Sequence, residues 1–211
     1  MKRYTQYTIT FAVGLLLLTP AVGLGWLRTF DLWAIQTIQA VGSRPLDYAL
    51  FVLTWLGSVE ITLTVWLFLA WTLRRRSARA AAWFAGLFVA ATLAELCLKQ
   101  AIPQARIPME FDRNPWQVHQ HVHTNYSFPS GHTLRTFYLG TVLAWLVGRS
   151  RDRAARRRIM AILTAVLGLI AFSRVYLGDH WPSDVAGGAL LAGLALCWLK
   201  PRLPSAPGDA A

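Results

Sequence analysis

The 211-residue chain is poor in charged residues, in acidic residues and in cysteine. Charged residues make up 15% and hydrophobic residues 55%, with ten tryptophans, and this composition excludes an ordinary soluble domain. Cys97 and Cys197 lie in apolar runs that the topology below places near opposite faces of a membrane, which excludes a disulfide between them. The net charge is +11, but the basic residues form no single face, which argues against nucleic-acid binding.

The sequence contains several long runs of apolar residues. Six of them approach the ~20 residues that a bilayer-spanning helix needs. They predict an all-α fold, a six-transmembrane helical bundle that forms a single domain over residues 1–200, with residues 201–211 as a disordered tail. The predicted spans are residues 8–27, 48–73, 80–100, 132–148, 158–176 and 183–199. The first run resembles a signal peptide, but its apolar character continues to Leu27, which favours a retained span.

The basic residues predict the orientation of the bundle. Fourteen of the 21 lysines and arginines lie at the two termini and in the links 74–79 and 149–158. By the positive-inside rule this side is cytoplasmic. We therefore expect a multi-pass plasma (inner) membrane protein with both termini in the cytoplasm.

The first outer link, residues 29–45, has an amphipathic pattern. Phe30, Trp33, Ile38 and Val41 fall roughly on one side of a helix. The pattern predicts a short interfacial helix after the first span, lying on the outer leaflet.

Residues suited to phosphate chemistry gather near the last outer link, in the segment SRVYLGDHWPSD over residues 173–184. Arg174 offers a two-pronged donor for an oxyanion. His180 can act as a nucleophile or a proton carrier near neutral pH. Asp184 lies in the first turn of the sixth span, where its carboxylate can orient the imidazole of His180.

Two earlier segments complete the candidate site. Lys99 and Arg106 add two positive charges to that of Arg174, and three cations suit a phosphate monoester. In the sequence PSGH, Ser130 is a plausible N-cap of the fourth span. The amides of Ser130 and Gly131 are then expected to point outward, where a helix N-terminus binds anions. Alternation of six spans places all three segments at the outer, periplasmic or extracellular, face.

These residues support a two-step displacement. Neutral His180 attacks phosphorus and forms a phosphohistidine. Protonated His132 donates to the leaving oxygen and then takes a proton from water. The cations do the electrostatic work, so we expect no metal and no other cofactor. Glu95 is expected to pair with Lys99 one helical turn away.

The segments KQAIPQARIP, PSGH and SRVYLGDHWPSD resemble the three signatures of the type 2 phosphatidic acid phosphatase superfamily, membrane lipid phosphate phosphatases related to vanadium haloperoxidases. The resemblance implies His180 as nucleophile, Asp184 as its partner and His132 as general acid. It also implies one set of phosphate binders: Lys99, Arg106, Ser130, Gly131 and Arg174. One departure is Ile107, which stands where the family usually has proline.

The predicted function is hydrolysis of a terminal phosphate from a membrane lipid, with lipid phosphate and membrane lipids as partners. The resemblance implies substrates of the undecaprenyl diphosphate, phosphatidylglycerophosphate or phosphatidic acid type. Two alternatives stay open. A lipid phosphotransferase could use the same phosphohistidine, and a lipid transporter could use an anion-binding vestibule, although transport needs no nucleophile and acid pair.

Several residues have open roles. Glu60 in the second span could contact the substrate or only hydrogen-bond to a neighbouring helix. Arg135 could face the phosphate or bind lipid headgroups. The run His119, His121 and His123 favours a polar surface over a metal site. Four aromatic residues are expected near the headgroup of the lipid: Phe111, Trp116, Tyr126 and Phe128.

Overall fold

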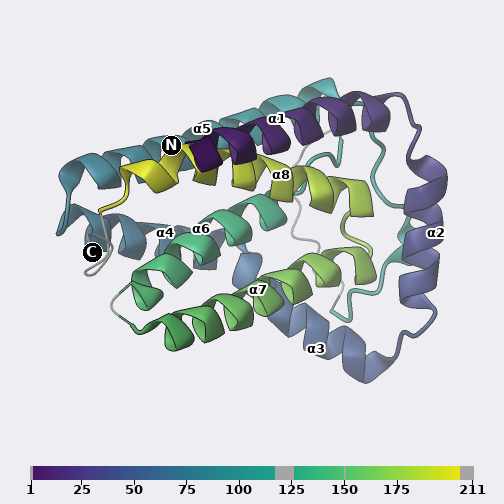
Figure 1. Ribbon diagram of the computed structural model, residues 1–211. Coiled ribbons are helices and arrows are strands. Elements are labelled where there is room, and N and C mark those ends of the chain that lie inside the picture. The colour runs from purple at the N-terminus through teal and green to yellow at the C-terminus, as the bar shows by residue number, and fades with distance from the viewer. Residues whose placement is uncertain (1, 117–125, 150, 205–211) are drawn as a thin grey trace.

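The computed structural model describes residues 2–116, 126–149 and 151–204, and all regular secondary structure in these ranges is helical (Figure 1). The α-helices are α1 Lys2–Gly23, α2 Arg28–Gln39, α3 Arg44–Thr54, α4 Val59–Arg74, α5 Ala78–Ala101, α6 Gly131–Gly148, α7 Arg153–Tyr176 and α8 Pro182–Leu199. The short 3-10 helices are η1 Trp55–Gly57, η2 Met109–Phe111 and η3 Lys200–Arg202. The histidine run 119–123 and most of the predicted tail lie outside the described residues.

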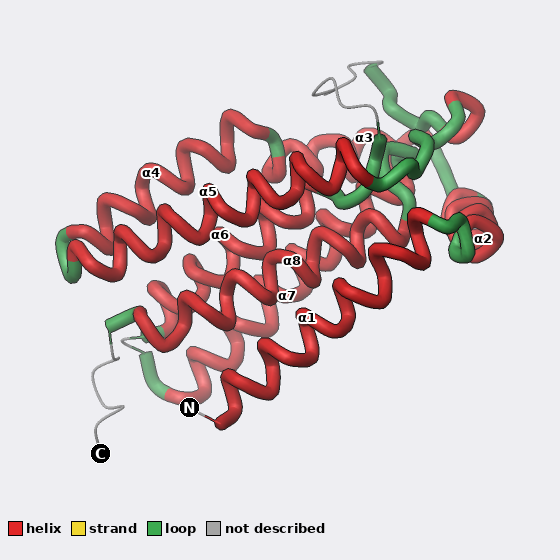
Figure 2. The backbone as a smooth tube through the Cα atoms, turned by 90° about the horizontal axis from the view of Figure 1, so that it is seen from above, coloured by secondary structure: helices red, strands yellow, loops and turns green. Residues whose placement is uncertain are grey.

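The long helices form a bundle with two distinct ends. In Figures 1 and 2, α2 lies across one end of the bundle. The start of α1, the end of α8 and the links α4–α5 and α6–α7 lie at the opposite end. The arginine-rich links therefore share one end of the molecule, which agrees with the arrangement that the distribution of basic residues predicts.

Each of the six predicted spans contains helix, but they do not all qualify as membrane spans. By length and composition, α1, α5, α7 and α8 can cross a membrane. The pair α3 and α4 raises the number to five when it counts as one bent span. Helix α6 is not among these candidates, since its first turns carry His132 and Arg135.

The predicted span 48–73 is not one continuous helix. It breaks at η1 and Ser58, and the axes of the two segments differ by 42°. Ser58 has extended backbone angles, and its side chain accepts a hydrogen bond from the amide of Ile61, as an N-cap does. The break places Glu60 in the first turn of α4 instead of the middle of a span.

Helix α2 confirms that the first outer link contains a helix. The face of α2 that packs against the bundle, however, differs from the face that the sequence predicts. Phe30 and Trp33 are exposed, whereas Ile38 packs inward against the apolar clusters beside α7. The most buried residues of the helix are Asp31, Ala34 and Ile35. The predicted grouping of Ile38 with the exposed aromatic residues is therefore wrong, because tertiary contacts favour the Asp31 face.

The core lies between α4, α5, α6 and α8. Its most buried large side chains include Phe84, Leu134 and Tyr138, and the Tyr138 hydroxyl donates to the carbonyl of Phe84 at 2.8 Å. Helix α1 packs along α8, where Leu190 covers Gly14. The core thus fixes α6 against α8, and these two helices carry two of the three signature segments.

The contact of α8 with the PSGH segment predicts a difference between two glycines. A Cβ on Gly188 would overlap the carbonyl oxygen of Ser130, whereas Gly168 on α7 has open space around it. We expect Gly188→Ala to destabilise the protein by about 1–3 kcal/mol through overpacking. Gly168→Ala should stabilise it by about 0.5–1 kcal/mol, as alanine does in a helix. Thermal unfolding of both variants in one detergent measures this difference, and equal shifts would contradict the packing.

Candidate active site

A cavity of about 760 Å³ opens at the end of the bundle that α2 covers, where α5 and α7 end and α6 and α8 begin. Six of the eight predicted site residues line it: Lys99, Arg106, Gly131, His132, Arg174 and His180. The other two, Ser130 and Asp184, are completely buried beside it. The fold therefore brings segments from distant parts of the chain to one cavity, as the alternation of spans predicts.

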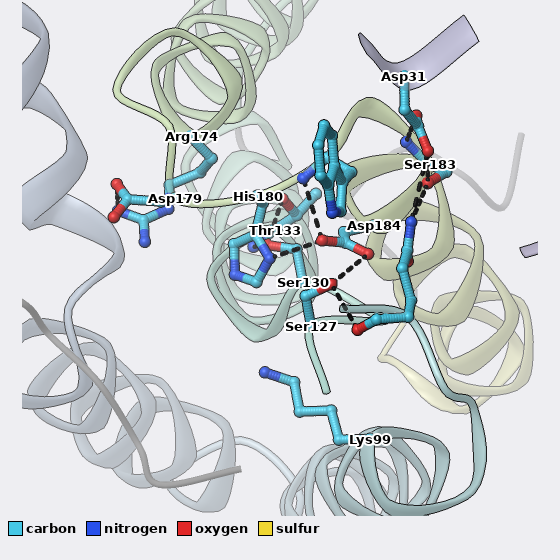
Figure 3. Close-up of polar contacts among 12 residues, drawn as sticks. Asp31, Lys99, Ser127, Ser130, Thr133, Arg174, Asp179, His180, Ser183 and Asp184 are labelled. Carbon is cyan, nitrogen blue, oxygen red and sulfur yellow. Dashed lines mark hydrogen bonds and ion pairs between the residues drawn. The ribbon is translucent and has the colours of Figure 1, made fainter. Parts of the chain in front are cut away.

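His180 and Asp184 form the hydrogen bond that their spacing predicts. Pro182 begins α8, so Asp184 lies in the first turn of that helix. Its Oδ2 atom is 3.1 Å from Nδ1 of His180 and accepts from the Trp181 amide at 3.0 Å. The Ser127 hydroxyl donates to the other carboxylate oxygen at 3.3 Å (Figure 3). The carboxylate thus engages Nδ1 of His180, and Nε2 is the ring nitrogen available for chemistry.

The turn before His180 is held by backbone contacts. The amides of Asp179 and His180 both donate to the carbonyl of Arg174, at 2.9 and 3.1 Å. Gly178 has φ +80°, and a Cβ at this position would overlap the carbonyl oxygen of Phe111. Glycine is therefore required here both by the left-handed backbone and by the close approach of the loop after α5.

The electrostatic surroundings of His180 favour the neutral imidazole. Burial and the positive charges of Lys99 and Arg174 hold the pKa of His180 well below its ordinary value of 6.5. In Figure 3 the Lys99 ammonium points toward the side of the site where His180 and Ser130 lie. A neutral ring is the form that can act as a nucleophile.

The cations are held by carboxylates. Lys99 pairs with Glu95 at 3.1 Å, as predicted. Nη1 of Arg174 is 3.0 Å from Asp179 and donates to the Thr54 hydroxyl at 2.9 Å. Nε of Arg174 is buried and has no hydrogen-bond partner among the described residues. These contacts orient the side chains before any anion binds, and they leave Arg174 with donor capacity in a buried place.

Arg106 is placed by the loop that follows α5. The indole of Trp181 donates to the carbonyl of Ala105 at 2.8 Å, which ties this loop to the residue after His180. Ile107, the departure from the family pattern, lines the same cavity as Arg106. The substitution of isoleucine for proline therefore leaves the guanidinium at the site.

The PSGH segment confirms one prediction and corrects another. Ser130 is the N-cap of α6, and its Oγ accepts from the amide of Thr133 at 3.4 Å. Its own amide, however, donates to the carbonyl of Asp184 at 2.9 Å, so this N–H does not point outward as expected. The reason is packing, since α6 must join α8 at this point. Gly131 does line the cavity, and its missing Cβ lets Glu95 and Arg135 approach.

His132 lies where a glycine makes room for it. A Cβ on Gly57 would stand 2.8 Å from Cδ2 of the His132 ring. The Nε2 atom of His132 is buried without a hydrogen-bond partner among the described residues. The ring is close enough to His180 and Arg174 for their charges to act on it. The structure therefore shows two histidines at one cavity, and the second has an unsatisfied nitrogen.

A polar network behind the site had no signal in the sequence. Asp31 on α2 accepts from the amide of Ser183 at 3.0 Å and from its hydroxyl at 2.6 Å (Figure 3). The side-chain amide of Gln104 donates to the hydroxyl of Ser183 at 3.0 Å. The backbone carbonyl of Gln104 accepts from the amide of Ser127 at 3.1 Å. Burial raises the pKa of Asp31, while the hydrogen bonds from Ser183 oppose that shift. The network ties α2 to the first turn of α8.

Some of the residues whose roles the sequence leaves open line the cavity and others do not. Glu60 and Arg135 both line it. Of the four aromatic residues expected near a headgroup, only Tyr126 lines it. Phe128 is completely buried beside Gly187, and Trp116 packs edge-on against Phe51. The lining also holds four carboxylates, Glu60, Glu95, Asp112 and Asp179, which balance much of the positive charge.

Metal ligands do not cluster in the ranges 2–116, 126–149 and 151–204. No group of three or more His, Cys, Asp or Glu side chains there could hold a metal ion. The cationic side chains among the described lining residues of the cavity are Lys99, Arg106, Arg135 and Arg174.

Comparison with known proteins finds relatives in sequence and in structure. Phosphatidylglycerophosphatase B of Haemophilus influenzae is 39% identical over 84 residues, which are 37% of this chain and 34% of that protein. Undecaprenyl-diphosphatase of Sulfolobus acidocaldarius is 40% identical over 78 residues, 37% of this chain and 34% of that protein. The matches thus span about a third of these relatives. The fold is similar to the crystal structure of the first transmembrane PAP2 type phosphatidylglycerolphosphate phosphatase from Bacillus subtilis, with a TM-score of 0.77, 21% identity and coverage of 92% of this chain and 94% of that chain.

Residues 92–205, more than half of the chain, match the sequence model of the PAP2 superfamily. This range contains all eight predicted site residues. The chain belongs to the PAP2 superfamily.

The surroundings of His180 predict the pH at which its ring protonates. Because burial, Lys99 and Arg174 disfavour the imidazolium, the titration midpoint should lie below 6.5. The neutral imidazole of His180 is then lost only as the pH falls through that lower value. NMR of histidine-labelled protein measures the midpoint, with His180→Gln to assign the signal. Lys99→Met should raise it toward 6.5, and a midpoint at or above 6.5 in the unaltered protein would contradict the electrostatic account.

Proposed function

We propose that this protein is an integral-membrane phosphatase that removes the terminal phosphate of a lipid phosphate or diphosphate through a phosphohistidine on His180. The observation that carries the proposal is the cavity itself. It brings a histidine oriented by Asp184, a second histidine with an unsatisfied nitrogen, and the cations Lys99, Arg106 and Arg174 to one place.

The cations bind and orient the phosphoryl group. Phosphoryl transfer depends mainly on positioning and on stabilising charge at the equatorial oxygens. Arg174 offers its buried Nε, while Asp179 and Thr54 hold the rest of the guanidinium. Lys99 stands on the last turn of α5, where Glu95 holds its ammonium. Gly131 lets the backbone approach an oxygen closely. Ser130 supports this arrangement as the N-cap of α6.

The first step forms the bond between Nε2 of His180 and phosphorus and breaks the bond to the lipid oxygen. Asp184 holds Nδ1 and stabilises the positive charge that develops on the ring. His132 gives its proton to the leaving oxygen. A bound phosphate supplies the negative charge that a protonated His132 needs among these cations.

The second step releases phosphate. His132, now neutral, takes a proton from water, and the water oxygen attacks phosphorus as the bond to Nε2 breaks. Inorganic phosphate leaves, and both histidines return to their initial protonation states. The sequence is complete without a redox step, and lysine and arginine side chains supply its electrostatic stabilisation.

A membrane lipid is the substrate that the surroundings favour. Trp55 and Val59 line the cavity at the break between α3 and α4, and both are about half exposed. A lipid can therefore reach the cavity sideways, past apolar side chains, while its phosphate meets the cations. The similarity to a phosphatidylglycerophosphatase B and to an undecaprenyl-diphosphatase supports a substrate of the phosphatidylglycerophosphate or undecaprenyl diphosphate type. Phosphatidic acid has the same terminal group.

The proposed location is the plasma membrane. Six crossings, with the α3–α4 pair as one and α6 as another, put the active site on the periplasmic or extracellular face. The arginine-rich end and both termini then lie in the cytoplasm, as the positive-inside rule favours.

Phosphate release from purified protein tests the proposal. We expect hydrolysis of a lipid phosphate in excess chelator, loss of activity to background in His180→Asn, and a loss of about 10²–10⁴-fold in His132→Gln. Arg44→Gln, which removes an exposed charge that does not line the cavity, should retain activity. Phosphorus-labelled substrate should leave an acid-labile label on the protein only when His180 is present.

Three results would contradict this function. They are binding of lipid phosphate without release, a requirement for added divalent metal, and unchanged activity in His180→Asn. Label that passes to another lipid instead of water would identify a phosphotransferase.

A further inference from the structure

A second cavity, of about 690 Å³, lies at the opposite end of the bundle. Helices α1, α6, α7 and α8 all contribute to its walls, which are mainly apolar. Among the lining residues are Phe11 of α1, Val142 of α6, Met160 of α7 and Leu196 of α8. This is the end at which α1 starts and α8 ends, and it carries the arginine-rich links (Figure 1). The length of the bundle therefore separates this second cavity from the catalytic cavity.

The same cavity is lined by four cationic side chains: Arg149, Arg156, Arg157 and Lys200. No aspartate or glutamate is among its described lining residues. This contrasts with the catalytic cavity, where four carboxylates offset the cations. A strongly positive rim over apolar walls is complementary to an anionic amphiphile.

Two of the cations are arranged around one indole. Cζ of Arg149 lies 4.9 Å from the centre of the Trp145 ring, and Nζ of Lys200 lies 5.3 Å from it. Such cation–π contacts hold charged groups near apolar surface. Gly148 has no Cβ, so the stem of Arg156 lies across α6 at this point. Three of the four positive groups, those of Arg149, Arg156 and Lys200, are thus packed against helices at the cavity.

We propose that this cavity binds one anionic phospholipid of the cytoplasmic leaflet. Its phosphate lies among Arg149, Arg156, Arg157 and Lys200, and an acyl chain lies along the apolar walls. Basic pockets between transmembrane helices on the cytoplasmic side are suited to such headgroups, and a volume of this size is typical of a ligand pocket. The site does not depend on the proposed hydrolysis, because its lipid is a ligand and not a substrate.

The two ends of the molecule are joined by the same helices. Helix α6 runs from His132 to the residues beside Trp145, and α8 runs from Asp184 to Leu199. A lipid that binds only the folded bundle stabilises it by mass action. We therefore expect the lipid to raise thermal stability without being required for basal activity.

Native mass spectrometry of delipidated protein tests the site with phosphatidylglycerol and phosphatidylcholine as probes. We expect one tightly bound phosphatidylglycerol and no comparable phosphatidylcholine. The double variant Arg156→Gln/Arg157→Gln should bind phosphatidylglycerol about 30-fold more weakly, which is about a fivefold loss for each charge. Arg75→Gln/Arg76→Gln removes the same charge from the other link at this end and should bind normally, because neither residue lines the cavity.

Two further variants separate the new site from its rivals. Thr141→Phe fills the cavity from α6 without changing charge, and should also lose the lipid. Lys99→Met/Arg106→Gln, in the catalytic cavity, should lose phosphatase activity and keep the lipid. Both arginine double variants should keep basal activity and unfold at the wild-type temperature when lipid is absent.

Four results would overturn the proposal. The first is equal affinity for phosphatidylcholine, and the second is an equal loss of binding in the two arginine double variants. The third is loss of the lipid in Lys99→Met/Arg106→Gln, which would place it in the catalytic cavity. The fourth is tighter binding by a chain that ends at Pro204, which would show that the protein's own tail occupies the cavity next to Leu203.

Discussion

The buried carboxylate of Asp184 is the point at which the parts of the site are joined. It accepts from the ring of His180, the amide of Trp181 and the hydroxyl of Ser127, and its backbone carbonyl accepts from the amide of Ser130. A completely buried charge is costly unless hydrogen bonds satisfy it. The hydrogen bonds of the Asp184 side chain and of its backbone carbonyl therefore fix His180, the start of α8 and the start of α6 relative to one another.

A second constraint is the pairing of the cations. Lys99 is held by Glu95 and Arg174 by Asp179, so the positive groups are oriented before substrate binds. Preorganised charge needs no rearrangement at the moment of reaction. Behind this layer, the Asp31–Ser183 hydrogen bonds tie the helix across the end of the bundle to α8. The cavity at the opposite end differs, since its described lining residues include cations but no carboxylates. This lining suits the bound anionic lipid proposed above, which is a ligand and not a substrate.

Local spacing accounts for the features that the sequence predicted well. The His180–Asp184 and Glu95–Lys99 contacts each join residues four apart, and the Ser130 cap joins residues three apart. Asp31 and Ser183 are separated by 152 positions, so no local pattern indicates their contact. The prediction that the Ser130 amide points outward was wrong for the same reason, since the carbonyl that accepts from it lies on another helix. Hydropathy identified six helical segments, but it missed the break at Ser58, and the polar residues of the site itself make α6 a weak candidate span.

The central claim is that both histidines and the three cations address one phosphoryl group. An experimental structure with bound orthovanadate, which mimics the five-coordinate state of that group, tests it most directly. We predict vanadium bonded to Nε2 of His180, with its equatorial oxygens contacted by Lys99, Arg106 and Arg174 and with His132 facing the apical oxygen. An oxyanion bound away from His180, or a His132 ring too distant to reach the opposite side, would contradict the account.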